Sequence, residues 1–227
     1  GQIRTEALDP EIAKNFLGGW GVNARLAWDA IPPDAEALSP ENAVILGTGP
    51  FSGTLVPGSA ELSITTKLPL SGGIGTSCGG GHFALMFKTS GYDHAVITGQ
   101  AAHPVYLKIH SDKVEILPAN DLWGLDTYET VDTLRQRHEP CSVIPIGPAG
   151  ENRVGISMTF IDKGGTVGYG GLPAVMGSKN LKAIVAIKGD RPLYVADSKG
   201  LTKAVDSMMV KVKSYRLRPN LIKGGTF

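Results

Sequence analysis

The sequence is poor in cysteine, in net charge and in long apolar runs. Its two cysteines, Cys78 and Cys141, are too few for a four-cysteine iron–sulfur cluster, a structural zinc site or a disulfide framework. A net charge of +1 gives no electrostatic reason to expect a nucleic acid or an anionic membrane surface as a partner. Because no run of 18 apolar residues and no signal-peptide pattern is present, we expect no membrane span and a cytoplasmic location.

Glycine, by contrast, is abundant. It accounts for 30 of the 227 residues, about twice the usual share. The hydrophobic share of 42% and the charged share of 19% are those of an ordinary folded protein. This length is enough for one large domain or one and a half.

The glycines belong to an internal repeat with an offset of 90 residues, in which Gly75–Gly99 aligns without a gap with Gly165–Gly189. The identical pairs are Gly75/Gly165, Thr76/Thr166, Gly80/Gly170, Gly81/Gly171, Ala84/Ala174, Met86/Met176, Ile97/Ile187 and Gly99/Gly189. One repeat of this length indicates a duplicated domain rather than a solenoid. We therefore expect two halves, roughly 40–99 and 140–189, related by a pseudo-twofold; chance similarity of two glycine-rich stretches is the alternative.

Local patterns predict an α+β fold in which strands outnumber helices, without regular βαβ alternation. An apolar run reaches Gly-Pro in each half, at residues 49–50 and 147–148, and a β-rich stretch follows. The predicted strands are Glu61–Lys67, Gly155–Ile161, Ala95–Thr98 and a hairpin of Val105–Ile109 with Lys113–Leu117 around His110-Ser111-Asp112. The predicted helices are Pro10–Leu17, Val22–Ala30, His82–Thr89 and Thr127–Arg137, the last with a capping box of Asp126 and Glu129.

The C-terminal part is predicted to be different. Asp197–Tyr215 places Leu201, Val205, Met208, Met209 and Val212 on one helical face. We expect residues 1–190 to form a base domain and residues 191–227 to begin a second, helical domain.

Short catalytic motifs in the sequence do not identify an active site. Gly75-Thr76-Ser77-Cys78-Gly79 fits the nucleophile elbow G-x-S-x-G, but the parallel α/β pattern that this motif requires is missing. Neither dinucleotide nor P-loop spacing can be drawn around 168–179. Cys78 and His82 stand four residues apart, which would allow a thiolate–imidazolium pair in a helix, although a small packing residue is the commoner role of such a cysteine.

The two glycine clusters, Gly79–Gly81 and Gly168–Gly171, are the remaining candidates for a binding site. Consecutive residues that are free to adopt positive φ can point their backbone N–H groups into a concavity that binds phosphates and polar heterocycles. Each cluster alone is more often a tight turn. Two matching clusters favour a ligand with two similar halves.

Longer strings carry a family resemblance. The runs LGGWGVNARL, LSPENAVILGTGPFSGT, TTKLPLSG, SGYDHAVITG, IGPAGENRV and GGLPAVMGSKNLKAI occur in order over nearly the whole chain. In this it resembles the N-terminal domain of the tungsten-dependent aldehyde ferredoxin oxidoreductases. The resemblance implies a β-rich base with internal pseudo-twofold symmetry that holds tungsten (or molybdenum) through two pterins, together with magnesium.

The resemblance also implies site residues. Ser77–Gly81 corresponds to the first pterin-contacting loop and Gly168–Leu172 to the second, and the backbone carbonyls of Cys78 and Gly170 are the expected magnesium donors. The implied cofactor-binding residues are Glu61, Ser77, Cys78, Gly79, Gly80, Gly81, Gly168, Tyr169, Gly170, Gly171 and Leu172. No catalytic acid or base is expected in this chain.

Three positions depart from familiar members. Glu61 and Tyr169 stand where arginines occur, and Cys78 stands where an asparagine occurs. Two arginines that face phosphates would have supplied charge-assisted contacts.

The function implied is the cofactor-binding part of an oxidoreductase that interconverts aldehydes and carboxylic acids, with ferredoxin or an iron–sulfur subunit as electron acceptor. The resemblance places the 4Fe-4S cluster and the catalytic groups in further domains of the same enzyme, which are partners of this one. The alternative is a divergent or non-catalytic homologue, such as a scaffold subunit, that keeps the fold without standard cofactor binding.

Overall fold

The computed structural model describes residues 1–111 and 113–225, so Asp112 of the predicted hairpin turn lies outside the described residues. The helices are α1 Pro10–Phe16, α2 Gly19–Ala30, α3 Phe83–Thr89, α4 Thr127–His138, α5 Pro148–Glu151, α6 Leu172–Ser178, α7 Ser198–Lys213 and α8 Arg218–Gly224, with a 3-10 turn η1 at Tyr169–Gly171. The strands are β1 Val44–Thr48, β2 Glu61–Lys67, β3 Ile74–Gly80, β4 His94–Ile97, β5 Val105–His110, β6 Lys113–Pro118, β7 Cys141–Pro145, β8 Thr159–Ile161, β9 Gly165–Val167 and β10 Leu181–Ile187.

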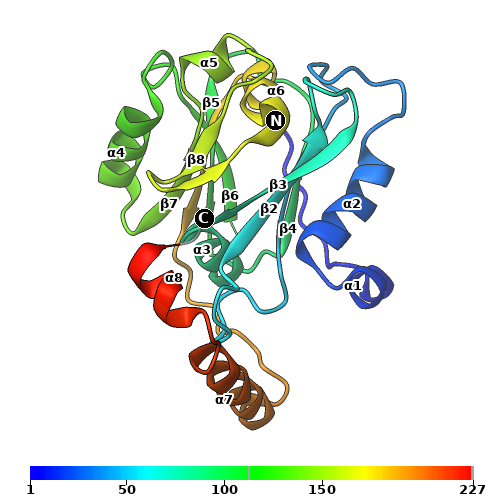
Figure 1. Cartoon of the computed structure of the whole chain (residues 1–227). Helices are drawn as coiled ribbons and strands as arrows, with labels where there is room; N and C mark the ends of the chain where they lie inside the picture. Colours follow the sequence, from blue (N-terminus) through cyan, green and yellow to red (C-terminus); the bar gives the residue numbers. More distant parts are fainter. Residues whose placement is uncertain (112, 226–227) are drawn as a thin grey trace.

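The strands form three sheets (Figure 1). The first has the order β3-β2-β1-β4 and is antiparallel throughout. The second has the order β6-β5-β10-β7, in which β5 and β10 are the parallel pair. Strands β8 and β9 form a third, short ladder. The α+β prediction is confirmed.

The two halves of the repeat contain the same succession of elements. In the first half the order is β1, β2, β3, α3 and β4, and in the second it is β7, β8, β9, α6 and β10, with α5 inserted after β7 and η1 before α6. Strand β1 pairs antiparallel with β4, as β7 does with β10. Strand β8 runs along β7, since Asp162 N–H donates to the Val143 carbonyl at 2.8 Å. The predicted duplication is therefore present in the topology as well as in the sequence.

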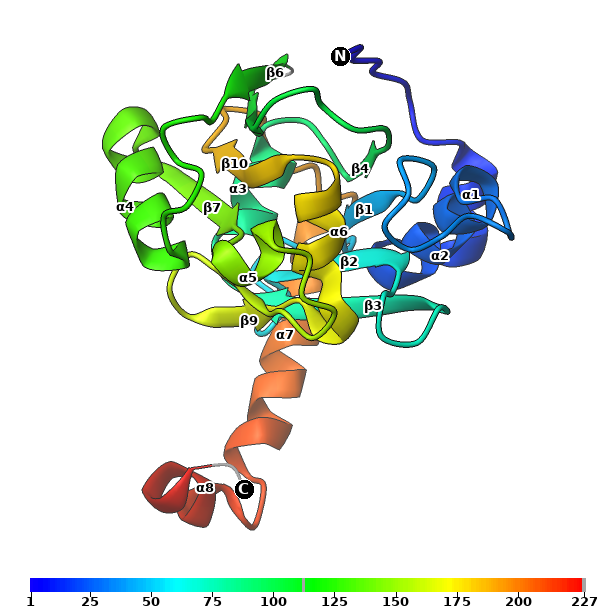
Figure 2. The same ribbon diagram turned by 90° about the horizontal axis from the view of Figure 1, so that it is seen from above.

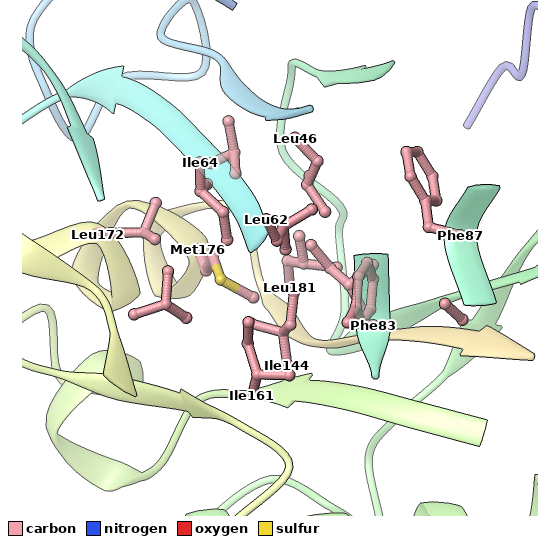
Figure 3. Packing of buried hydrophobic residues seen from close by; sticks show 14 of the residues in the cluster. Leu46, Leu62, Ile64, Phe83, Phe87, Ile144, Ile161, Leu172, Met176 and Leu181 are labelled. Carbon is pink, nitrogen blue, oxygen red and sulfur yellow. The ribbon is translucent and has the colours of Figure 1, made fainter. Parts of the chain in front are cut away.

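The main core lies where the two halves meet (Figure 3). Leu62 and Ile64 of β2, Phe83 and Phe87 of α3, and Ile144 of β7 are almost fully buried there. Leu172, Met176 and Leu181 of the second repeat copy belong to the same core. Large apolar side chains from both copies share this core, so burial stabilises their association.

Most predicted elements are confirmed to within a few residues. Helix α4 has the expected capping box, in which Asp126 accepts from the Glu129 N–H at 2.8 Å and Glu129 accepts from the Asp126 N–H at 3.0 Å. The predicted strand Gly155–Ile161 was wrong in its first half, because only Thr159–Ile161 pairs. Ser157 N–H donates to the Val154 carbonyl at 2.9 Å, which closes a turn over residues that alternate like a strand.

A buried polar network attaches α2 to the first sheet. The Asn23 side-chain amide donates to the carbonyls of Ile45 and Ser63 at 3.1 and 3.0 Å. Its Oδ1 therefore accepts, and His94 Nδ1 lies 2.9 Å from it. His94 accordingly carries its proton on Nδ1.

Acid should weaken the fold through His94. Burial lowers the pKa of His94 to about 4, an effect that nearby Asp93 opposes and Lys88 reinforces. In the unfolded chain the same pKa is about 6.5, so between these values the unfolded state binds a proton that the native state does not. The contribution of His94 to the free energy of unfolding is thus fully present above pH 6.5. It falls by about 3 kcal/mol as the pH drops to 4. Denaturant unfolding across this range should show a shallower acid loss for His94→Gln, and parallel curves would contradict the assignment.

Helices α7 and α8 extend away from the sheets (Figure 2). Neither helix buries any residue, although α7 has the predicted amphipathic pattern, begins at an Asp197 cap and is confirmed as a helix. Among residues 1–111 and 113–225, no helix has the length and apolar character needed to cross a bilayer.

Candidate functional site

The first glycine cluster, Ser77–Gly81, lies at the end of strand β3 and not in a loop as expected. Residues 74–80 pair one by one with β2, from Ile74 opposite Lys67 to Gly80 opposite Glu61. Pairing with β2 holds this glycine-rich stretch extended, and Gly79–Gly81 do not have positive φ. The expectation of positive φ in this cluster was wrong.

The register of β3 fixes where its carbonyls point. Gly81 N–H donates to the Ala60 carbonyl, and Leu68 N–H donates to the Gly73 carbonyl. Odd-numbered residues of β3 therefore form the hydrogen-bonded pairs with β2, and the N–H and C=O groups of even-numbered residues point away from it. Strand β3 is an edge of its sheet. The Cys78 carbonyl consequently points out of that edge, and its role as a magnesium donor stays a prediction.

The second glycine cluster, Gly168–Leu172, is a true turn that leads into α6. Gly168, Gly170 and Gly171 have φ values of 138°, 72° and 87°. A Cβ at Gly171 would overlap the Gly155 carbonyl oxygen, and one at Gly168 would approach the Thr159 nitrogen at 2.8 Å. This cluster thus needs glycine both for conformation and for close packing.

The two clusters lie against each other. A Cβ added at Gly79 would approach the Thr166 carbonyl oxygen at 2.9 Å, and one at Gly165 would overlap the Gly80 carbonyl oxygen. Ser77 Oγ accepts hydrogen bonds from the N–H groups of Gly168 at 2.9 Å and Tyr169 at 3.3 Å. The sequence placed these segments about 90 residues apart, and the fold brings them into direct contact.

The turn after β2 touches the second cluster and the start of β3, and no local sign of this contact is present in the sequence. Leu68 is buried, and its side chain lies beside both Gly75 and Gly170. Leu70 N–H donates to the Gly170 carbonyl at 3.3 Å. That carbonyl keeps a second lone pair, so it remains able to coordinate a cation. The only sequence signal was the family string TTKLPLSG.

The exposed side of the clusters carries few polar side chains. Cys78 is exposed, and its Sγ lies 3.4 Å from Ser63 Oγ. Tyr169 is 63% exposed, and Glu61 is exposed opposite Gly80 in the ladder. Gly81 is half-buried and Leu172 belongs to the core. Backbone, rather than ionised side chains, makes most of this surface.

The structure does not support the nucleophile elbow or the helical Cys78–His82 pair. The G-x-S-x-G string lies inside an antiparallel strand, not at a strand-to-helix elbow. Cys78 lies in that strand while His82 precedes α3, so they do not share a helix. Across the described ranges, no three His, Cys, Asp or Glu side chains gather as a metal site.

A large cavity of about 1710 Å³ lies elsewhere. It is bounded by residues 1–9, by β4 and by β5, and neither glycine cluster lines it. Of the residues of the two clusters, Cys78, Gly80 and Tyr169 are exposed, whereas Gly79, Gly168, Gly170, Gly171 and Leu172 are buried.

The fold and its paired glycine clusters define a duplicated α+β architecture that known proteins share. The family model "Aldehyde ferredoxin oxidoreductase, N-terminal domain" matches residues 1–188. The tungsten-containing aldehyde ferredoxin oxidoreductase of Pyrococcus furiosus is 38% identical over 227 residues, covering 99% of this chain and 36% of that protein. The chain therefore belongs to the aldehyde ferredoxin oxidoreductase family and spans about a third of the length of these relatives.

Other relatives act on different compounds. An "aliphatic sulfonate oxidoreductase, WOR-like subunit" of the same organism is 36% identical over 209 residues, covering 85% of this chain and 33% of that protein. The solved active-site complex BamBC of benzoyl coenzyme A reductase, in complex with 1,5-dienoyl-CoA, matches with a TM-score of 0.89 and 35% identity. That match covers 94% of this chain and 33% of the BamBC chain.

Proposed function

We propose that the two glycine clusters together bind one tungsten (or molybdenum) bis-pterin cofactor. The observation that carries this proposal is their direct contact, in which Ser77 Oγ of the first cluster accepts from the N–H groups of Gly168 and Tyr169 of the second. A ligand with two similar arms requires two similar surfaces at a fixed spacing, and the duplicated fold supplies them. Family membership supports the same assignment.

The residues present fit such a group in their backbone. A Cβ at Gly80 would meet nothing within 4 Å, so the side of Gly80 where a side chain would stand is open to an approaching ligand. The carbonyls of Cys78 and Gly170 supply oxygen donors of the kind magnesium prefers. Gly79, Gly81, Gly168, Gly171 and Leu172 would hold these surfaces in place, with Glu61 and Tyr169 at the rim.

The structure differs from the expected site, in which backbone N–H groups alone would line a concavity. The amides of Gly168 and Tyr169 point to Ser77, not outward. With Glu61 and Tyr169 in the place of arginines, phosphate groups would depend on magnesium and on the remaining backbone for charge compensation.

In this proposal the chain orients the cofactor and shields one side of it, and it contributes no catalytic acid or base. The bound group would supply two-electron redox chemistry. The whole enzyme would interconvert aldehydes and carboxylic acids. Ferredoxin or an iron–sulfur subunit would receive the electrons, through a 4Fe-4S cluster in further domains. Residues 191–227, with α7 and α8, would begin the first of these domains.

Metal and pterin analysis of the intact gene product tests the proposal. We expect tungsten or molybdenum at about one atom per protein, with two pterins released per metal and measured by fluorescence after oxidation. A protein free of both metals and of pterin would overturn it and favour the scaffold alternative.

The likeness to BamBC favours a second candidate, reduction of an aromatic acyl-CoA. Assays of the intact protein with aldehydes and with 1,5-dienoyl-CoA, each with a redox dye, separate the two. Dye reduction by aldehydes alone supports the first candidate, and dye reduction by the dienoyl-CoA alone supports the second.

A further inference from the structure

Ser77 joins the two glycine clusters through its side chain. Its Oγ accepts from two consecutive backbone amides, those of Gly168 at 2.9 Å and Tyr169 at 3.3 Å. The side chain is half-buried between the clusters. A single hydroxyl oxygen therefore satisfies two donors that lie more than 90 residues away in the sequence.

The two partners differ in backbone conformation. Ser77 belongs to β3, whose seven residues all pair with β2. The second cluster contains three glycines with positive φ, at positions 168, 170 and 171, and glycine backbone loses the most conformational freedom on ordering. The Ser77 side chain therefore joins a strand paired along its length to a turn that depends on glycine conformation.

Within residues 1–111 and 113–225, a backbone bond from the turn after β2 also reaches this turn. Leu70 N–H reaches the Gly170 carbonyl at 3.3 Å, which is long for an N–H···O bond. Without the Ser77 acceptor, the start of the turn at Gly168 and Tyr169 would lose both of these side-chain contacts. The turn would then rotate more freely relative to β3.

We infer that Ser77 is a positioning residue that fixes the second glycine cluster against β3 and so sets the spacing of the two cofactor-holding surfaces. The cofactor part of this inference rests on the proposed function. Holding a binding surface in its bound form beforehand reduces the entropy that binding costs. A two-armed ligand is sensitive to the spacing, because one misplaced surface releases one arm.

Amide hydrogen exchange tests the positioning role without any cofactor. In Ser77→Ala, the N–H groups of Gly168 and Tyr169 should exchange about tenfold faster than in the unchanged chain, as expected for the loss of hydrogen bonds of this kind. The matched control is Thr76→Ala on the opposite face of the same strand, which loses the 2.7 Å contact to Thr65 Oγ1. That variant should leave exchange at these two amides unchanged. Equal exchange in Ser77→Ala and the unchanged chain, or equal acceleration in both variants, would refute the inference.

The amount of cofactor that the protein retains tests whether the position of the turn matters for cofactor binding. After desalting, intact protein with Ser77→Ala should retain about fivefold less pterin and metal than the unchanged protein, while Thr76→Ala retains a normal amount. Equal retention in Ser77→Ala and the unchanged protein overturns the inference and leaves the proposed function standing. If the unchanged protein carries no pterin, the proposed function fails, and amide exchange alone still decides whether Ser77 positions the turn.

Discussion

Replacing Lys182 with methionine is expected to reduce the free energy of unfolding by about 3–5 kcal/mol. The Lys182 ammonium is fully buried on β10, where it pairs with Glu151 of α5 and donates to the Leu125 carbonyl at 2.7 Å. Burial lowers the pKa of this ammonium, while Glu151 opposes the shift. Removal of Lys182 leaves the nearly buried Glu151 carboxylate without its counter-ion.

Denaturant unfolding measures this effect against two comparison variants. Lys163→Met breaks an exposed pair with Asp132 and should cost less than about 1 kcal/mol. The double variant Lys182→Met with Glu151→Leu should recover much of the loss, because no buried charge remains. A loss below about 1 kcal/mol in the single variant would contradict a buried, paired lysine at this place.

Gly171→Ala is expected to destabilise the fold by about 3 kcal/mol. Its φ of 87° is strained for alanine, and the added Cβ would overlap the Gly155 carbonyl oxygen. Gly72→Ala is the matched control, since its φ is 70° but its Cβ would meet nothing within 4 Å. That control should lose only about 1 kcal/mol, the conformational part. If thermal or denaturant unfolding gives similar losses of stability for both variants, close packing at Gly171 does not contribute to the stability of the fold.

The duplication could be predicted from the sequence because both copies keep identical residues where the fold needs them. Gly81 and Gly171 are such a pair, although their roles differ. A Cβ at Gly81 would approach Ile161 at 2.7 Å, whereas Gly171 also requires positive φ. The capping box of α4 was predictable for another reason, since Asp126 and Glu129 act within one turn.

The features that could not be predicted depend on contacts between residues that are far apart in the sequence. Ile74–Gly80 is a strand only because β2 offers it a ladder, and its glycines alone indicated a loop. Gly155–Met158 alternates like a strand but lies in a turn that packs on the second glycine cluster. The contacts of Ser77 and Leu68 with residues near 170 have no local signal at all.

Cofactor content in a variant that adds a side chain at the exposed Gly80 tests the central claim most directly. Gly80 and Gly164 are both exposed, and a Cβ at either would meet nothing within 4 Å. We expect intact protein with Gly80→Val to unfold within about 0.5 kcal/mol of the unchanged protein. Its tungsten (or molybdenum) and pterin content should fall at least about tenfold, because a side chain there occupies ligand space. Gly164→Val should keep full content. Normal metal and pterin in Gly80→Val would contradict a cofactor held at the paired glycine clusters.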